Sequence, residues 1–67
     1  MKYTYIPKDK RFEDNAGEKI TREEALRMMK NNYQDAEYAL DNSLALFSNG
    51  SGVASIGLVF GDIEVIK

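Results

Sequence analysis

The sequence predicts a small α+β domain with a three-stranded antiparallel sheet, in the order strand, helix, helix, strand, strand. Three observations lead to this class. Apolar side chains recur at helical spacing through residues 21–47, and short runs rich in aromatic and β-branched residues occupy residues 2–6 and 53–66. Because the helical stripe needs an apolar partner, we expect one bent helix or two consecutive helices to cover one face of the sheet.

The first expected strand is residues 2–6, where alternation places Tyr3 and Tyr5 on one side and Pro7 ends the run. Residues 8–19 follow. They are dense in charge, and Phe12 is the one large apolar side chain that could anchor them. We therefore expect a mobile loop here.

The helical region begins at Thr21, because Thr21-Arg22-Glu23-Glu24 fits a capping box. Residues 31–32 are both Asn, which has poor helix propensity, and Asn32 or Asp35 could cap a second helix. The pattern predicts either one bent helix or two helices joined by a tight turn near residues 31–35. A second weak point at residues 41–43 leaves residues 44–47 either helical or extended.

The C-terminal part reads as a β-hairpin. Residues 48–52 form a Gly-rich turn, residues 53–60 a strand, and residues 63–66 a returning strand, with Gly61-Asp62 as the predicted two-residue hairpin turn. The expected core combines the helical stripe with the inner faces of these strands: Leu26, Met29, Tyr33, Leu40, Leu44, Phe47, Ile56, Leu58, Phe60, Ile63 and Val65.

Size and composition argue against an enzyme. A domain of 67 residues buries only about 60% of its unfolded surface, so a deep cleft would be cut from a thin core. The chain has no Cys and no His, which removes the usual nucleophile, general base and zinc ligands. The glycines fit neither phosphate-binding motif, since Ser55 and Leu58 occupy diagnostic positions. We expect a non-catalytic protein without cofactor or metal.

The N-terminus does not resemble a signal peptide, because residues 1–6 alternate polar and apolar side chains and charged residues follow Pro7. No apolar run approaches the roughly 20 residues that a membrane span requires. These features predict a soluble, cytoplasmic protein.

Charge is distributed unevenly along the chain. The net charge is −2, yet residues 31–66 contain no Lys or Arg while residues 1–30 contain eight. One interpretation is an acidic surface that only favours solubility. The other is a docking surface for a basic partner, with Tyr38 as an aromatic anchor among the carboxylates. The candidate partner-binding residues are Asp35, Glu37, Tyr38, Asp41, Asp62 and Glu64.

Our leading functional prediction is therefore a protein-binding module that docks on a basic surface of a larger protein. By analogy of size and charge, it could inhibit a nucleic-acid-handling enzyme, as small proteins of phages and mobile elements do. One alternative is a dimeric nucleic-acid-binding regulator that uses Lys2, Tyr5, Lys8, Lys10 and Arg11, although interspersed acidic residues oppose it. Another is an accessory subunit of a larger assembly. The thin core also predicts self-association, through a sheet edge or the helical stripe.

Overall fold

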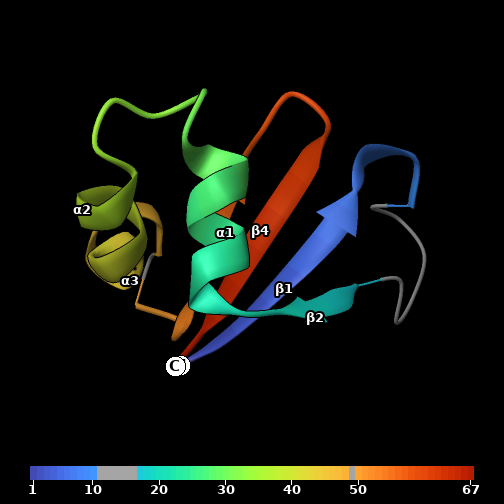
Figure 1. Cartoon of the computed structure of the whole chain (residues 1–67). Helices are drawn as coiled ribbons and strands as arrows, with labels where there is room; N and C mark the ends of the chain where they lie inside the picture. The colour runs from blue at the N-terminus through green and yellow to red at the C-terminus, as the bar shows by residue number, and fades with distance from the viewer. Residues whose placement is uncertain (11–16, 49) are drawn as a thin grey trace.

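The computed structural model describes residues 1–10, 17–48 and 50–67, which form two layers. A four-stranded antiparallel sheet has the strand order β2-β1-β4-β3, and α1 lies over one of its faces with α2 and α3 beside it (Figure 1). The described elements are β1 (Lys2–Pro7), the 3-10 helix η1 (Lys8–Lys10), β2 (Glu18–Ile20), α1 (Arg22–Met29), α2 (Ala36–Asp41), α3 (Ser43–Phe47), β3 (Val53–Gly57) and β4 (Gly61–Ile66).

Strand register decides which side chains meet the helices. Tyr3 of β1 lies opposite Val65 of β4, and Val65 in turn lies opposite Ala54 of β3. Because side chains alternate along a strand, all three residues point to the same face. That face and the helices bury one cluster of apolar side chains: Ala25, Met29, Ala39, Leu40, Ala54, Ile56, Ile63 and Val65.

The expected start of the helical region is confirmed. The Glu24 backbone N–H donates to Thr21 Oγ1 at 3.1 Å, and the Thr21 N–H donates to Glu24 Oε1 at 2.9 Å, which completes the capping box. The break near residues 31–35 is also present, and Asp35 Oδ1 caps α2 by accepting from the Tyr38 N–H at 3.0 Å. Asn42 then separates α2 from α3, so residues 44–47 are helical rather than extended.

The prediction of three strands is wrong, although the α+β class is right. The additional strand is β2, whose first two residues, Glu18 and Lys19, fall within the stretch 8–19 that was expected to be a loop. It pairs antiparallel with β1 through Tyr3–Ile20, Thr4–Lys19 and Tyr5–Glu18. In the same stretch Lys8–Lys10 form η1, while the expected anchor Phe12 lies outside the described residues.

The predicted turn at Gly61-Asp62 is also wrong, because both residues belong to β4. The chain instead reverses through residues 58–60, and the Leu58 N–H donates to the Gly61 carbonyl at 2.8 Å. This shift carries Phe60 out of the expected core, where its side chain is 48% exposed. Phe47 at the end of α3 is 41% exposed and is likewise outside the buried cluster.

Close packing against β1 explains why residue 61 is a glycine. A Cβ atom at Gly61 would lie 2.5 Å from the Ile6 carbonyl oxygen and 2.7 Å from Cε1 of Tyr5. The Tyr5 hydroxyl donates to the Phe60 carbonyl at 3.1 Å, and the rings of these two residues have centroids 5.9 Å apart. Gly61 thus lets the Tyr5 ring lie across the β4 backbone.

Candidate protein-binding surface

Helix α2 presents the central part of the predicted partner-binding set. It buries Ala39 and Leu40 against the core, so the helical period places Glu37, Tyr38 and Asp41 on its exposed side. Tyr38 is 59% exposed, a large fraction for an aromatic side chain. We refer to Asp35, Glu37, Tyr38 and Asp41 as the α2 surface.

A cation from α1 organises this surface. The Arg22 guanidinium donates from Nε to Asp41 Oδ1 at 3.0 Å and from Nη2 to Asp41 Oδ2 at 2.7 Å. The same Nη2 lies 3.4 Å from Glu37 Oε1. This forked arrangement joins α1 to α2 and fixes the orientation of both carboxylates.

The ion pair also affects ionisation. The hydrogen bond from Arg22 lowers the pKa of Asp41 below its ordinary value, and the hydrogen bond to Asp41 raises the pKa of Arg22. Both groups are therefore charged at neutral pH. Three carboxylates and one guanidinium leave the α2 surface with Arg22 at a net charge of −2.

Sequence reasoning did not identify Arg22 as part of this surface. It was assigned only to the first turn of a helix, and Asp41 lies 19 residues away along the chain. Only the antiparallel return of α2 against α1 brings the two residues together, so no local sequence pattern could have indicated the pair.

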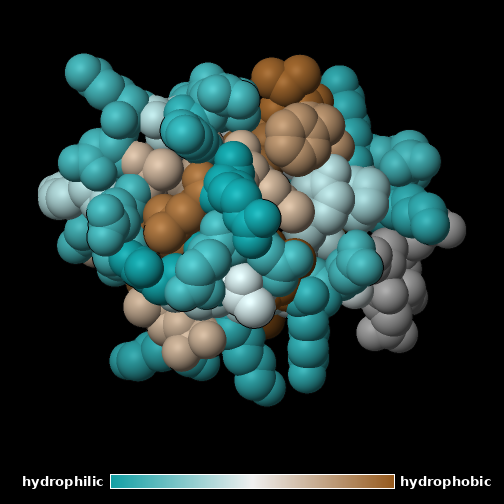
Figure 2. Space-filling model, in the orientation of Figure 1, coloured by the Kyte–Doolittle hydropathy of each residue, from teal (hydrophilic) through white to brown (hydrophobic). Residues whose placement is uncertain are grey.

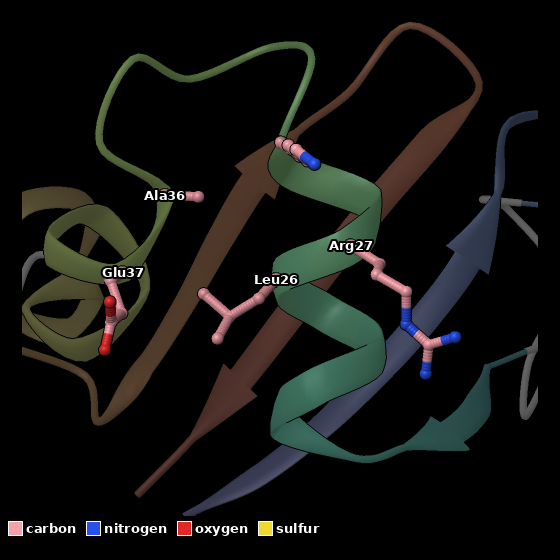
Figure 3. A pocket seen from close by; sticks show the side chains of 5 residues that line it. Leu26, Arg27, Ala36 and Glu37 are labelled. Atoms are coloured by element: carbon pink, nitrogen blue, oxygen red, sulfur yellow. The ribbon is translucent and has the colours of Figure 1, made fainter.

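A shallow groove of about 260 Å³ lies between α1 and α2, next to Glu37. Figure 3 shows Leu26 directed from α1 toward α2, with Ala36 and Glu37 on the α2 side. Arg27 and Lys30 also line the groove, but the Arg27 guanidinium turns away from it. Apolar atoms are visible between α1 and α2 in the space-filling view (Figure 2), so the α2 surface adjoins a small apolar depression.

The other two predicted partner-binding residues lie elsewhere. Asp62 and Glu64 alternate along β4 with the buried Ile63 and Val65, so they point to the sheet face opposite the helices. The structure therefore divides the six predicted residues between two sides of the molecule. The alternation of acidic and apolar residues along β4 in the sequence already indicated that Asp62 and Glu64 share the face opposite Ile63 and Val65.

The alternative nucleic-acid set is divided as well. Lys2 lies on the same sheet face as Glu64, whereas Tyr5 is on the helix-covered face, with its hydroxyl bonded to Phe60. Lys8 and Lys10 are exposed in η1. Arg11, the fifth residue of this set, lies outside the described residues. The Tyr5 ring thus does not share a surface with Lys2, as base stacking beside a phosphate contact would require.

Within the described residues, no helix has the length and apolar character needed to cross a membrane. In the same part of the chain, no group of three or more acidic side chains is placed to hold a metal ion. No family model matches this chain, and no curated protein or solved structure matches it either.

Proposed function

We propose that this protein is a non-catalytic binding module, and that the α2 surface docks on a basic surface of a larger protein. One observation carries the proposal: a largely exposed tyrosine, Tyr38, lies on a helix whose charged side chains, Glu37 and Asp41, are both carboxylates. Tyrosine is enriched at the centres of protein interfaces, because its ring is apolar and its hydroxyl can still hydrogen-bond. The helix itself contains no Lys or Arg.

The carboxylates and the ring would contribute differently. Glu37 and Asp41 would attract Lys or Arg side chains of the partner, which raises the association rate and excludes acidic partners. Tyr38 would be buried on docking and slow dissociation. Arg22 would keep Asp41 oriented before the partner arrives, which reduces the entropy lost on binding.

The partner class follows from this charge. Extended basic protein surfaces are typical of proteins that bind nucleic acid, since they neutralise phosphates. Carboxylates held at those positions would occupy phosphate sites and compete with the nucleic acid. We therefore propose a nucleic-acid-handling enzyme as the partner and inhibition as the result of docking.

The test compares proteins captured from host lysate by wild-type bait and by Tyr38→Ala bait. A partner that uses the α2 surface is captured by the wild type and should bind Tyr38→Ala at least about 30-fold more weakly, the size of an interface hot spot. Thermal unfolding should change little, because Tyr38 is 59% exposed. Equal binding of both baits contradicts the proposal.

Charge variants refine the test. Glu37→Gln removes a carboxylate from the α2 surface, while Glu23→Gln removes an exposed carboxylate from α1 and serves as the matched control. Only the first should slow association, and the difference should shrink at high salt. A heparin column with a salt titration of labelled nucleic acid tests the alternative, because steeply salt-dependent binding of the protein itself would favour the nucleic-acid regulator.

A further inference from the structure

The hairpin turn between β3 and β4 carries apolar side chains where turns are usually polar. The Leu58 N–H donates to the Gly61 carbonyl at 2.8 Å, so Val59 and Phe60 are the two central residues of the turn. Two-residue hairpin turns favour Asn, Asp and Gly at these positions, because the favoured turn types require positive φ values. Val and Phe therefore occur here against the local turn preference, and such departures are typical of functional sites.

These side chains form an apolar projection. Val59 is 77% exposed and Phe60 is 48% exposed, while Leu58 beside them packs partly against the core. In the space-filling view, apolar side chains gather at the top of the molecule, where the β3–β4 turn lies (Figure 2). We call Leu58, Val59 and Phe60 the apolar tip. Single exposed apolar residues are ordinary on a protein surface, but consecutive ones at a projecting turn indicate a contact surface.

The backbone of the apolar tip is anchored to neighbouring elements. The Phe60 carbonyl accepts two hydrogen bonds, from the Tyr5 hydroxyl at 3.1 Å and from the Lys8 N–H at 3.0 Å. On the β3 side, the Gly57 carbonyl just before the tip accepts from the Tyr33 hydroxyl at 2.9 Å. Because these contacts fix both sides of the turn, little conformational entropy would be lost when the tip docks.

Basic side chains adjoin the apolar tip through η1. The hydrogen bond from Lys8 to Phe60 places the start of η1 beside the turn, and the side chains of Lys8 and Lys10 are exposed. Two lysines and one aspartate, Asp9, leave η1 with a net charge of +1. Asp62 of β4 is the acidic residue next in sequence to the turn, and it points to the sheet face opposite the helices. The tip is therefore an uncharged apex with cationic neighbours.

We propose that the apolar tip inserts into the surface of a membrane that contains anionic lipids. A bilayer interface presents phosphate groups above acyl chains, and the protein presents a matching pair of groups: ammonium groups beside an apolar apex. The stems of Lys8 and Lys10 are apolar, so they can lie along the tip while their ammonium groups reach the phosphates. A fluid acyl layer also accommodates a projecting turn, whereas a protein partner would need a preformed cavity of matching shape.

The inference does not depend on the proposed function. The apolar tip and η1 share no residue with the α2 surface, which belongs to a different element. Vesicles made of equal parts phosphatidylcholine and phosphatidylglycerol test it by sedimentation. We expect the wild-type protein to bind them more tightly than vesicles of phosphatidylcholine alone, and the difference to shrink at high salt.

A turn variant isolates the contribution of the tip. Val59→Asn combined with Phe60→Gly removes both exposed apolar side chains and creates a sequence that two-residue turns prefer. This variant should fold, as measured by circular dichroism, and bind the anionic vesicles at least about tenfold more weakly. Leu46→Gln removes an apolar side chain that is 51% exposed on α3, so it is the matched control and should bind like the wild type.

A fluorescent reporter locates the insertion. The chain contains no Trp, so Phe60→Trp places a single one in the apolar tip and Leu46→Trp places a single one on α3. Anionic vesicles should shift the emission of the first variant to shorter wavelength and leave that of the second unchanged, because only the tip enters the acyl layer.

Charge variants test the lipid headgroup. Lys8→Gln combined with Lys10→Gln should weaken binding to the anionic vesicles, whereas Lys2→Gln, at the opposite end of β1, should not. A wild type that binds neither kind of vesicle, a turn variant that binds like the wild type, an unshifted emission from the Phe60→Trp variant, or η1 variants with undiminished binding would each overturn the proposal.

Discussion

The close approach of β1 to β4 at Gly61 predicts a large effect from one methyl group. In Gly61→Ala the new Cβ would lie 2.5 Å from a backbone oxygen of Ile6 and 2.9 Å from the Tyr5 hydroxyl oxygen. The Ile6 oxygen belongs to the paired backbone of β1, so the variant must displace this backbone as well as the Tyr5 ring. That movement breaks the hydrogen bond from Tyr5 to the Phe60 carbonyl.

The expected loss follows from these two changes. Overpacking a well-filled site destabilises by about 1–3 kcal/mol, and the lost hydrogen bond removes about 1 kcal/mol more. A domain of 67 residues is stable by roughly 3–10 kcal/mol in total. Gly61→Ala should therefore remove about a fifth or more of the stability and lower the unfolding temperature by roughly 10–30 °C.

The same hairpin provides the control. In Gly57→Ala the nearest atom to the new Cβ is Asp62 Oδ1 at 3.9 Å, an ordinary contact. This variant should gain about 0.4–1 kcal/mol, because alanine restricts the unfolded chain. Urea unfolding followed by circular dichroism measures both variants. If Gly61→Ala is as stable as Gly57→Ala, the reasoning about Tyr5 and Gly61 is refuted.

Two further predictions concern a buried hydroxyl and the loss of stability at low pH. Ser43 is fully buried and its Oγ has no hydrogen-bond partner among the described residues. Ser43→Ala should therefore raise the free energy of unfolding, measured by urea denaturation, by about 1 kcal/mol. A decrease would mean that the hydroxyl is hydrogen-bonded. The pKa of Asp41 is lowered by the Arg22 hydrogen bond, and that of Glu24 by the Thr21 backbone N–H, from ordinary values of 3.8 and 4.5. A carboxyl group whose pKa is lower in the folded protein stabilises the fold at pH values above its ordinary pKa. This stabilisation is lost as the pH falls through the lowered pKa, so the free energy of unfolding should decrease below about pH 4.5. Arg22→Gln should make that decrease shallower and return the Asp41 pKa toward 3.8 in an NMR titration; an unchanged titration would refute the role of Arg22.

Local signals predicted the fold class and the helix boundaries well. The capping box at Thr21 and the cap at Asp35 depend on side chains within three residues of the backbone groups they bind, so the sequence displays them directly. The buried residues Met29, Ile63 and Val65 were likewise predicted, because periodicity identifies the inward face of a helix or strand.

The features that sequence missed depend on distant partners. β2 is three residues long and contains Glu18 and Lys19, so it has no apolar alternation and is a strand only because β1 pairs with it. Gly61 was taken for a turn residue, whereas the Tyr5 ring, 56 positions earlier, determines its identity. The acidic residues were grouped by charge alone, although Asp62 and Glu64 point away from α2.

β1 and β4 are neighbours in the sheet, and Lys2 lies opposite Ile66, so the two ends of the chain emerge side by side (Figure 1). This pairing joins the most distant parts of the sequence and closes the largest loop in the fold, which slows folding. A short linker between the ends, with a new opening in the exposed turn at residues 58–60, would convert β4 and β1 into consecutive strands of a hairpin. A circular permutant of this kind would keep all three strand pairs. It would make β4–β1 pairing local along the chain and transfer the longest loop closure to β3–β4, whose strands would then lie at opposite ends of the chain.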